Sequence, residues 1–218
     1  MIAALALALA LQSAGPPPEA RSVPLETVFP FWTDYLDLPE DERDAFELGY
    51  SITTRTQPED RGSWSYWVDA GDGPQPVTPD QGGLMTPPDR EAFERGAVLI
   101  TDAPQGGVAV SMTLTLPGAA KTEYTLAEIE AALEQSRRAM RSLMGLRALV
   151  MPRMDAVRFD FDGPAPDAVL IGEDGAEAPI ESVYGESVMV RPGDRIYRGA
   201  VAVRFGRPPV AALLEVSR

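Results

Sequence analysis

Apolar and polar residues follow two successive series along this chain, and each series opens with a helical pattern and continues with strand-like runs. In the first, apolar residues recur at helical spacing, at Leu25, Val28, Phe29, Trp32, Tyr35 and Leu36. Six short runs typical of strands follow between residues 47 and 117. This series predicts a helix within residues 25–46 and then about six strands.

The second series repeats that order. Thr125 and Glu128 form a T-x-x-E capping box, in which each side chain satisfies a free N–H group at the start of a helix. The apolar face of the predicted helix carries Leu126, Ile129, Leu133, Met140, Leu143 and Met144. Strand-like runs return between residues 156 and 217.

Short matches align the two series. Asp72-Gly73 corresponds to Asp174-Gly175, Met85 to Met189, and the tripeptide at 96–98 to that at 199–201, with separations of 102 to 104 residues. Asp-Gly between extended runs favours a type I′ hairpin turn. We therefore expect an α+β fold that is a tandem duplication of a unit with one helix followed by about six mainly antiparallel strands, at residues 25–118 and 119–218. A groove between the two units is a favoured place for a ligand.

The amino-terminal residues predict export. Residues 1–14 hold an apolar run of the length of a signal-peptide core, followed by small residues, whereas a transmembrane helix needs about 20 apolar residues. We expect a signal peptide at 1–14, an extended Pro-rich spacer at 15–24, a periplasmic or secreted protein, and no stable membrane insertion after cleavage. The alternative is an amino-terminal helix that packs on the folded body.

Composition narrows the chemistry. The chain of 218 residues has no His and no Cys, which excludes Ser-His-Asp and Cys-His nucleophiles and zinc sites built from nitrogen and sulfur ligands. The net charge of −14 argues against a nucleic-acid partner, because such binding neutralises phosphates with Lys and Arg. We expect no cofactor. The route to hydrolysis left open is a pair of carboxylates, as in glycosidases.

One basic segment departs from the acidic whole. Between residues 137 and 158 a single acidic residue, Asp155, stands among six arginines: Arg137, Arg138, Arg141, Arg147, Arg153 and Arg158. Arg favours planar, two-pronged capture of carboxylate or phosphate groups. We predict a binding face at Arg137, Arg138, Arg141, Arg147 and Arg153 for an acidic envelope component or protein. The alternative is a solvated face that pairs with the chain's own carboxylates.

Aspartates gather at predicted turns. Asp160, Asp162 and Asp167 lie close together, as do Asp69 and Asp72, but the full spacing of a calcium loop is absent. Side-chain hydrogen bonds that shape turns explain these residues, so we predict no metal site, and calcium at Asp160, Asp162 and Asp167 stays the alternative.

The segments YLDLPEDERDAFELGY (35–50) and LVMPRMDAVRFDF (149–161) resemble those of an uncharacterised group of signal-bearing bacterial proteins. The resemblance implies export and a bacterial source and no particular activity. Together these patterns favour an exported, non-catalytic binding or interaction protein of the bacterial envelope, with contact through a groove between the units or through the Arg-rich second helix. The alternative is a carboxylate-dependent hydrolase of a cell-wall or sugar polymer.

Overall fold

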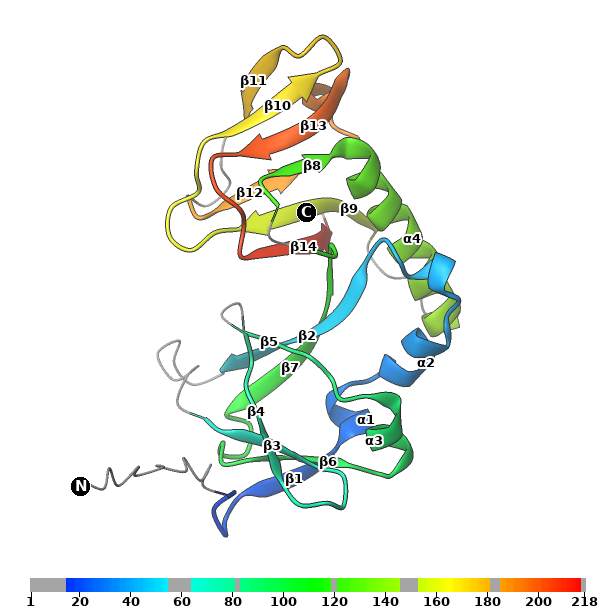
Figure 1. Ribbon diagram of the computed structural model, residues 1–218, viewed down its shortest axis with the longest axis vertical. Coiled ribbons are helices and arrows are strands. Elements are labelled where there is room, and N and C mark those ends of the chain that lie inside the picture. Colours follow the sequence, from blue (N-terminus) through cyan, green and yellow to red (C-terminus); the bar gives the residue numbers. More distant parts are fainter. Residues whose placement is uncertain are drawn as a thin grey trace, which may run out of the picture.

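The computed structural model of this protein describes residues 15–54, 64–80, 83–118, 121–145, 153–180 and 185–216. Helices combine with three antiparallel sheets, which confirms the α+β class. Figure 1 shows two halves stacked along the long axis, with the helices gathered along one side.

The first half contains four helical segments and seven strands among the described residues. In chain order they are β1 (Arg21–Pro24), α1 (Leu25–Val28), α2 (Trp32–Asp37), the 3-10 helix η1 (Glu40–Glu42), β2 (Glu47–Thr54), β3 (Tyr66–Asp69), β4 (Gln75–Val77), β5 (Leu84–Met85), α3 (Arg90–Glu94), β6 (Val98–Thr101) and β7 (Val108–Thr115).

The second half is built around one long helix. Its described elements are β8 (Glu123–Thr125), α4 (Leu126–Met144), β9 (Met154–Asp160), β10 (Ala168–Gly172), β11 (Glu177–Ile180), β12 (Ser187–Val190), the 3-10 helix η4 (Arg195–Tyr197), β13 (Ala200–Phe205) and β14 (Ala211–Val216).

The strand orders of the two halves correspond. One outer sheet has the order β1-β6-β3-β4, and the other, read in the same direction, has the order β8-β13-β10-β11. The predicted strands at 96–100 and 199–203 thus hold the same place, as β6 and β13. The central sheet, β12-β9-β14-β7-β2-β5, takes three strands from each half. Its halves join where Leu213 pairs with Thr115 and where the Leu116 N–H donates to the Ala212 carbonyl at 2.9 Å.

The first helical pattern is broken, which corrects the expectation of a single helix. Proline lacks an N–H and disfavours helical geometry in the residue before it. Pro30 accordingly separates α1 from α2: Phe29 leaves the helical region at φ −120° and ψ 65°, and Phe31 has φ +66°. A 3-10 turn follows Pro39. The apolar spacing identified the buried face, and proline decided where the helix stops.

Both Asp-Gly pairs lie in hairpins, as predicted, but the turn type is wrong. β3 pairs with β4, and β10 with β11. A type I′ turn needs positive φ at both central residues, and among the described residues Phe31 alone of the non-glycines has positive φ. At the second hairpin the Gly175 N–H donates to Gly172 O, and Gly175 alone is left-handed, at φ +78°. This is the arrangement of a type I turn with a glycine bulge.

The predicted spacer at 15–24 ends earlier than expected. Residues 21–24 form β1, which pairs along its whole length with β6. Pro24 is tolerated because β1 is an edge strand of its sheet.

Aromatic rings fill the core of each half. In the first, Phe29 meets Tyr50 edge-on with ring centroids 5.0 Å apart. In the second, Phe159 of the central sheet lies 4.8 Å from both Tyr124 and Phe205 of the outer sheet. Edge-to-face and tilted pairs of this kind add to the stabilisation from burial. These ring contacts therefore hold the segment after α1 in the first half, and the outer sheet in the second half, against the central sheet.

A single amide links α4 to the first half. Gln135 is 5% exposed, and its Nε2 donates to Asp41 O at 2.9 Å and to Asp44 Oδ1 at 2.5 Å. Its Oε1 accepts from the Ala45 N–H at 2.7 Å. Both ends of the buried Gln135 amide are thus satisfied by groups of the first half.

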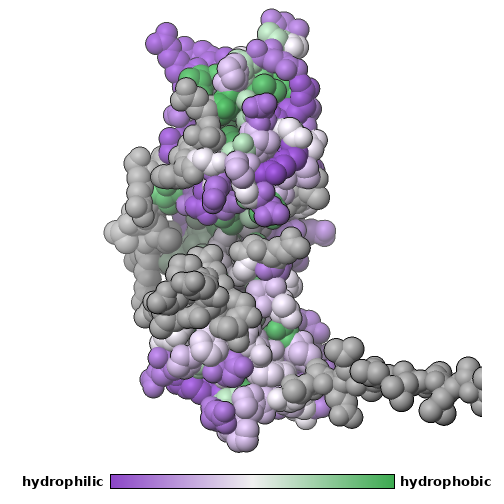
Figure 2. Space-filling model, turned by 90° about the vertical axis from the view of Figure 1, so that its left-hand side faces the viewer, coloured by the Kyte–Doolittle hydropathy of each residue, from purple (hydrophilic) through white to green (hydrophobic). Residues whose placement is uncertain are grey.

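The surface is mixed, and Figure 2 shows apolar areas set among hydrophilic ones, with more of them in the upper part of the molecule. The large apolar side chains that are exposed among the described residues, Ile196, Val201 and Val210, all belong to the second half.

Candidate functional site

Helix α4 carries the predicted basic face and is well defined by its own sequence. The capping box of Thr125 and Glu128 is present in both directions. Leu126, Ile129, Leu133 and Met140 are buried, as their spacing predicts, and α4 packs against β8, β9 and β13. Gly145 ends the helix with φ +54°, a conformation that glycine adopts without strain. The position of each arginine around α4 follows from this burial.

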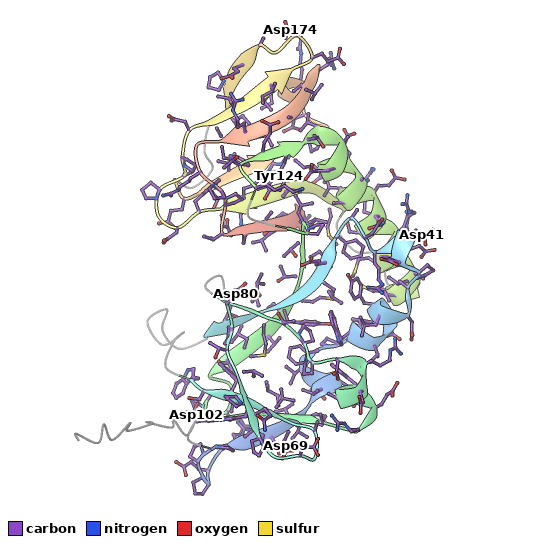
Figure 3. All side chains as sticks on the ribbon, in the orientation of Figure 1. Asp41, Asp69, Asp80, Asp102, Tyr124 and Asp174 are labelled. Atoms are coloured by element: carbon purple, nitrogen blue, oxygen red, sulfur yellow. The ribbon has the colours of Figure 1, made fainter. Side chains whose placement is uncertain are left out.

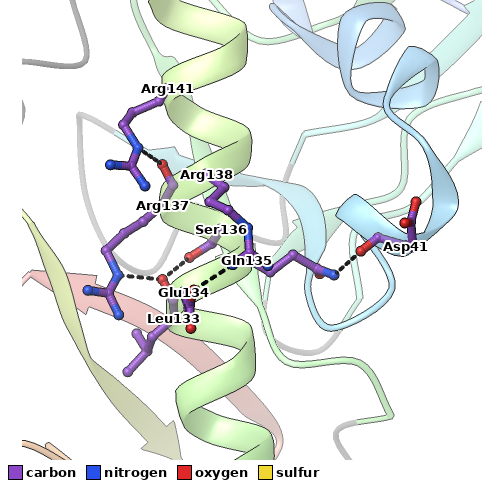
Figure 4. Close-up of polar contacts among 8 residues, drawn as sticks. All are labelled: Asp41, Leu133, Glu134, Gln135, Ser136, Arg137, Arg138 and Arg141. Atoms are coloured by element: carbon purple, nitrogen blue, oxygen red, sulfur yellow. Dashed lines mark hydrogen bonds and ion pairs between the residues drawn. The ribbon is translucent and has the colours of Figure 1, made fainter.

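The three arginines of the predicted face separate. Arg137 is half-buried, and its Nε donates to Leu133 O at 2.6 Å. Arg138 is exposed and pairs with Glu134 at 2.5 Å, one turn earlier. The Nε of exposed Arg141 donates to Arg137 O at 3.2 Å. Figure 4 shows Arg137 and Arg141 on one side of the helix, with Gln135 reaching toward the first half on the other.

The remaining arginines also divide. Arg158 is bound by the chain's own carboxylates, Asp160 at 2.9 Å and Glu215 at 2.6 Å, so it belongs to the internal pairing that the sequence left as the alternative. Arg147 lies outside the described residues. Arg153 lies just before β9, is exposed, and its charge acts on Arg137 of α4.

An open hollow lies beside α4, and we call it the α4 hollow. Its volume is about 480 Å³, within the range of small-molecule sites. Three segments line it: α4, the start of β9, and the loop between β12 and η4. The lining residues are Glu130, Leu133, Glu134, Arg137, Arg153, Asp155, Arg191, Pro192, Gly193 and Asp194.

Three guanidinium groups therefore converge on one cavity. Burial lowers the pKa of Arg137, and the positive charge of Arg153 lowers it further. The Nε of Arg191 is shielded from solvent and has no hydrogen-bond partner. The ion pairs found among the described residues include neither Arg137, nor Arg153, nor Arg191. The same lining also carries four carboxylates, Glu130, Glu134, Asp155 and Asp194, so charges of both signs meet in the hollow.

Sequence reasoning missed Arg191. It stands at the end of β12, directly before the repeated loop-and-strand phrase PGDRIYRGAVAV, and it lies 38 residues beyond Arg153. No local run of charge marks it. The available signal was the repeated phrase, because the corresponding phrase of the first series also follows a short strand and leads into a helix.

A second hollow, of about 510 Å³, lies between α2 and the end of α4, where the two halves meet. Its lining is acidic. Asp34, Asp37 and Glu42 face Ser142 and Leu143 across it. Asp37 is already paired with Arg90 at 2.6 Å.

Asp69 and Asp174 shape hairpin turns as predicted, whereas Asp160 lies in β9 and not in a turn. Asp69 accepts from the Gly71 N–H, and Asp174 from the Ala176 N–H. Figure 3 shows these residues and Asp80 and Asp102 spread over separate loops. Asp160 is occupied by Arg158 and Ser187. In the part of the chain that the structure describes, no three acidic side chains are grouped as a metal ion requires.

Comparison with family models, curated proteins and solved structures gave no match for this chain. Among the described helices, none combines the length and the apolar composition needed to cross a membrane.

Proposed function

We propose that this protein is a non-catalytic binding protein and that the α4 hollow receives an anionic group of its ligand. The observation that carries this proposal is the convergence of Arg137, Arg153 and Arg191 from three separate segments. Guanidinium groups make strong, charge-assisted hydrogen bonds to carboxylate and phosphate oxygens. Their convergence on a hollow, without ion pairs to hold them, is typical of an anion site rather than of a solvated face.

The choice of binding over catalysis follows from residue types. With no His and no Cys, the chain has no ordinary general base of neutral pKa and no thiol nucleophile. For a carboxylate-dependent hydrolase the simplest place is the acidic hollow between α2 and α4, whose lining holds Asp34, Asp37 and Glu42 and no arginine. There Arg90 already holds Asp37, one of its three carboxylates.

We also propose that the protein is exported and acts in the bacterial envelope. This rests on the apolar run and small residues of 1–14 and on the Pro-rich stretch that follows. An acidic component of the envelope, or a protein within it, would supply the anionic group.

We further propose that the two halves arose by tandem duplication. The matching strand orders of the two outer sheets support this proposal. The central sheet supports it too: counted outward from its middle, the first half contributes β7, β2 and β5, and the second half contributes β14, β9 and β12 in the corresponding order. Each half also opens with an edge strand that leads directly into a helix, β1 into α1 and β8 into α4.

The test is a titration of the purified protein with inorganic phosphate, citrate and N-acetyl-L-alanyl-L-alanine, followed by calorimetry or NMR. We expect at least one of these anions to bind, and Arg137→Gln and Arg191→Gln each to weaken that binding about tenfold. Binding should also weaken as salt rises.

Arg141→Gln is the matched control. It removes the same charge one turn from Arg137, but Arg141 does not line the hollow. We expect it to change the dissociation constant less than about threefold. Equal losses in Arg137→Gln and Arg141→Gln would place the contact on the exposed helix face, and the absence of binding by all three anions would refute the proposed function.

A further inference from the structure

The α4 hollow holds charges of both signs, and this limits what it can bind. Each of its three segments contributes an arginine and at least one carboxylate: Arg137 with Glu130 and Glu134 on α4, Arg153 with Asp155, and Arg191 with Asp194. Glu134 is paired with Arg138, which stands outside the hollow. Glu130 and Asp194 are the further carboxylates of α4 and of the loop, and Asp155 adds a third, so the lining carries both signs of charge rather than being simply basic.

The charges on α4 are arranged along one stripe. Glu130 and Arg137 are seven residues apart, two helical turns, so both face the same side with their Cα atoms roughly 10 Å apart along the axis. A ligand lying along this stripe meets a carboxylate toward the start of the helix and a guanidinium toward its end. A purely anionic ligand of that length would be repelled at the Glu130 end.

Size and polarity point the same way. Leu133 and Pro192 are the apolar side chains in the lining, so the hollow offers little to a hydrophobic ligand. An extended peptide spans about 3.3–3.6 Å per residue, so two or three residues cover the distance between the two charges.

We infer that the α4 hollow binds a small dipolar ligand, namely a peptide of two or three residues whose amino and carboxyl termini are both free. Its carboxylate would bind Arg137, Arg153 and Arg191, and its ammonium group would bind Glu130 and Asp194. This inference rests on the proposed function and specifies the ligand class for the same site. It adds a role for Glu130 and Asp194, which the proposed function does not require.

The experiment compares three forms of one dipeptide on the same protein: L-alanyl-L-alanine, its N-acetyl form and its carboxyl-terminal amide. We expect the free dipeptide to bind about tenfold more tightly than either blocked form, because it alone satisfies both ends of the stripe. Glu130→Gln and Asp194→Asn should each reduce the advantage over the acetylated form to less than about threefold, while Arg137→Gln should weaken both.

Glu94→Gln is the control, since it removes an exposed carboxylate of α3 in the first half. It should leave all three affinities unchanged. If the free and acetylated dipeptides bind equally, or if Glu130→Gln has no effect, the dipolar assignment is overturned while the anion site stands. If phosphate or citrate binds through Arg137 and Arg191 and no dipeptide does, the ligand class is wrong and the proposed function survives. If none of these probes binds, both fall.

Discussion

The two halves differ in the contact between a helix and the segment that follows an edge strand of the central sheet. In the first, α2 and the loop after β5 are joined directly: Trp32 Nε1 donates to Pro88 O at 3.0 Å, and Arg90 pairs with Asp37 at 2.6 Å. In the second, α4 and the loop after β12 stay apart, and the α4 hollow opens between them with Arg191 on its wall.

The difference separates stabilising contacts from binding contacts on similar frameworks. In the first half Arg90, the first residue of α3, meets a carboxylate of α2. In the second half Arg137 of the helix and Arg191 of the loop both line the hollow. The first arrangement lowers the energy of the folded chain, and under the proposed function the second is the site that binds a ligand, a trade of stability for function that is common at binding sites.

The largest expected effect comes from separating the halves at Gln135. Gln135→Leu removes three hydrogen bonds at a buried position and leaves the Ala45 N–H and the Asp41 carbonyl without their partner. We expect the free energy of unfolding to fall by about 3 kcal/mol in a denaturant titration. Ala127→Leu, on the exposed side of α4, should change it by less than about 0.5 kcal/mol. A small effect of Gln135→Leu would mean that the central sheet alone joins the halves.

The dependence of the free energy of unfolding on alkaline pH tests one buried tyrosine in each half. Burial raises the pKa of Tyr50 in the first half, and it raises the pKa of Tyr124 in the second to about 12. The neutral phenol is favoured in the fold, so this stabilisation is complete below pH 10, near the pKa of unfolded tyrosine, and is lost as pH rises toward the folded value.

We therefore expect the free energy of unfolding to fall above pH 10, by about 2 kcal/mol or less for Tyr124. Tyr50→Phe and Tyr124→Phe should each flatten the pH dependence, as measured by denaturant titrations between pH 8 and 12. An unchanged slope in both variants would contradict the assignment.

We expect replacements of Arg90 and Arg191 to change the free energy of unfolding in opposite directions. Arg90→Met breaks the ion pair with Asp37 and should lower the free energy of unfolding by about 0.5–1 kcal/mol. Arg191→Met removes a buried donor that has no partner and should raise it by about 1 kcal/mol in the absence of ligand. Thermal unfolding of both variants in one low-salt buffer decides this, and a loss of stability in Arg191→Met would show that Arg191 is structural.

The last prediction concerns Trp32, which joins α2 to the loop after β5 in the first half. Trp32→Phe loses the hydrogen bond to Pro88 O and should cost about 1 kcal/mol beyond the loss of ring area. Trp64→Phe provides the control, because the Nε1 of Trp64 is buried without a partner and its removal carries no such cost. Equal stabilities of the two variants would argue that the Trp32 contact does not join α2 to that loop.

Much of the local structure was predictable. The capping box and the apolar stripe of α4 involve residues within a few positions of one another, so their spacing determined the helix. The hairpins at Asp72-Gly73 and Asp174-Gly175 and the strand runs follow for the same reason. The break at Pro30 was also predictable, because proline ends a helix, but the apolar residues on both sides of it keep helical spacing and favoured one continuous helix.

By itself the sequence determined α4 with its buried face, the two hairpins, most of the strands and an Arg-rich segment, because each depends on neighbours along the chain. Tertiary structure alone decided that β7 pairs with β14 in a shared sheet, that Arg158 is bound by Asp160 and Glu215, and that Arg191 joins Arg137 and Arg153. Those outcomes depend on which loops and strands the packing of the core brings together, and residues so far apart leave no pattern that a single sequence displays.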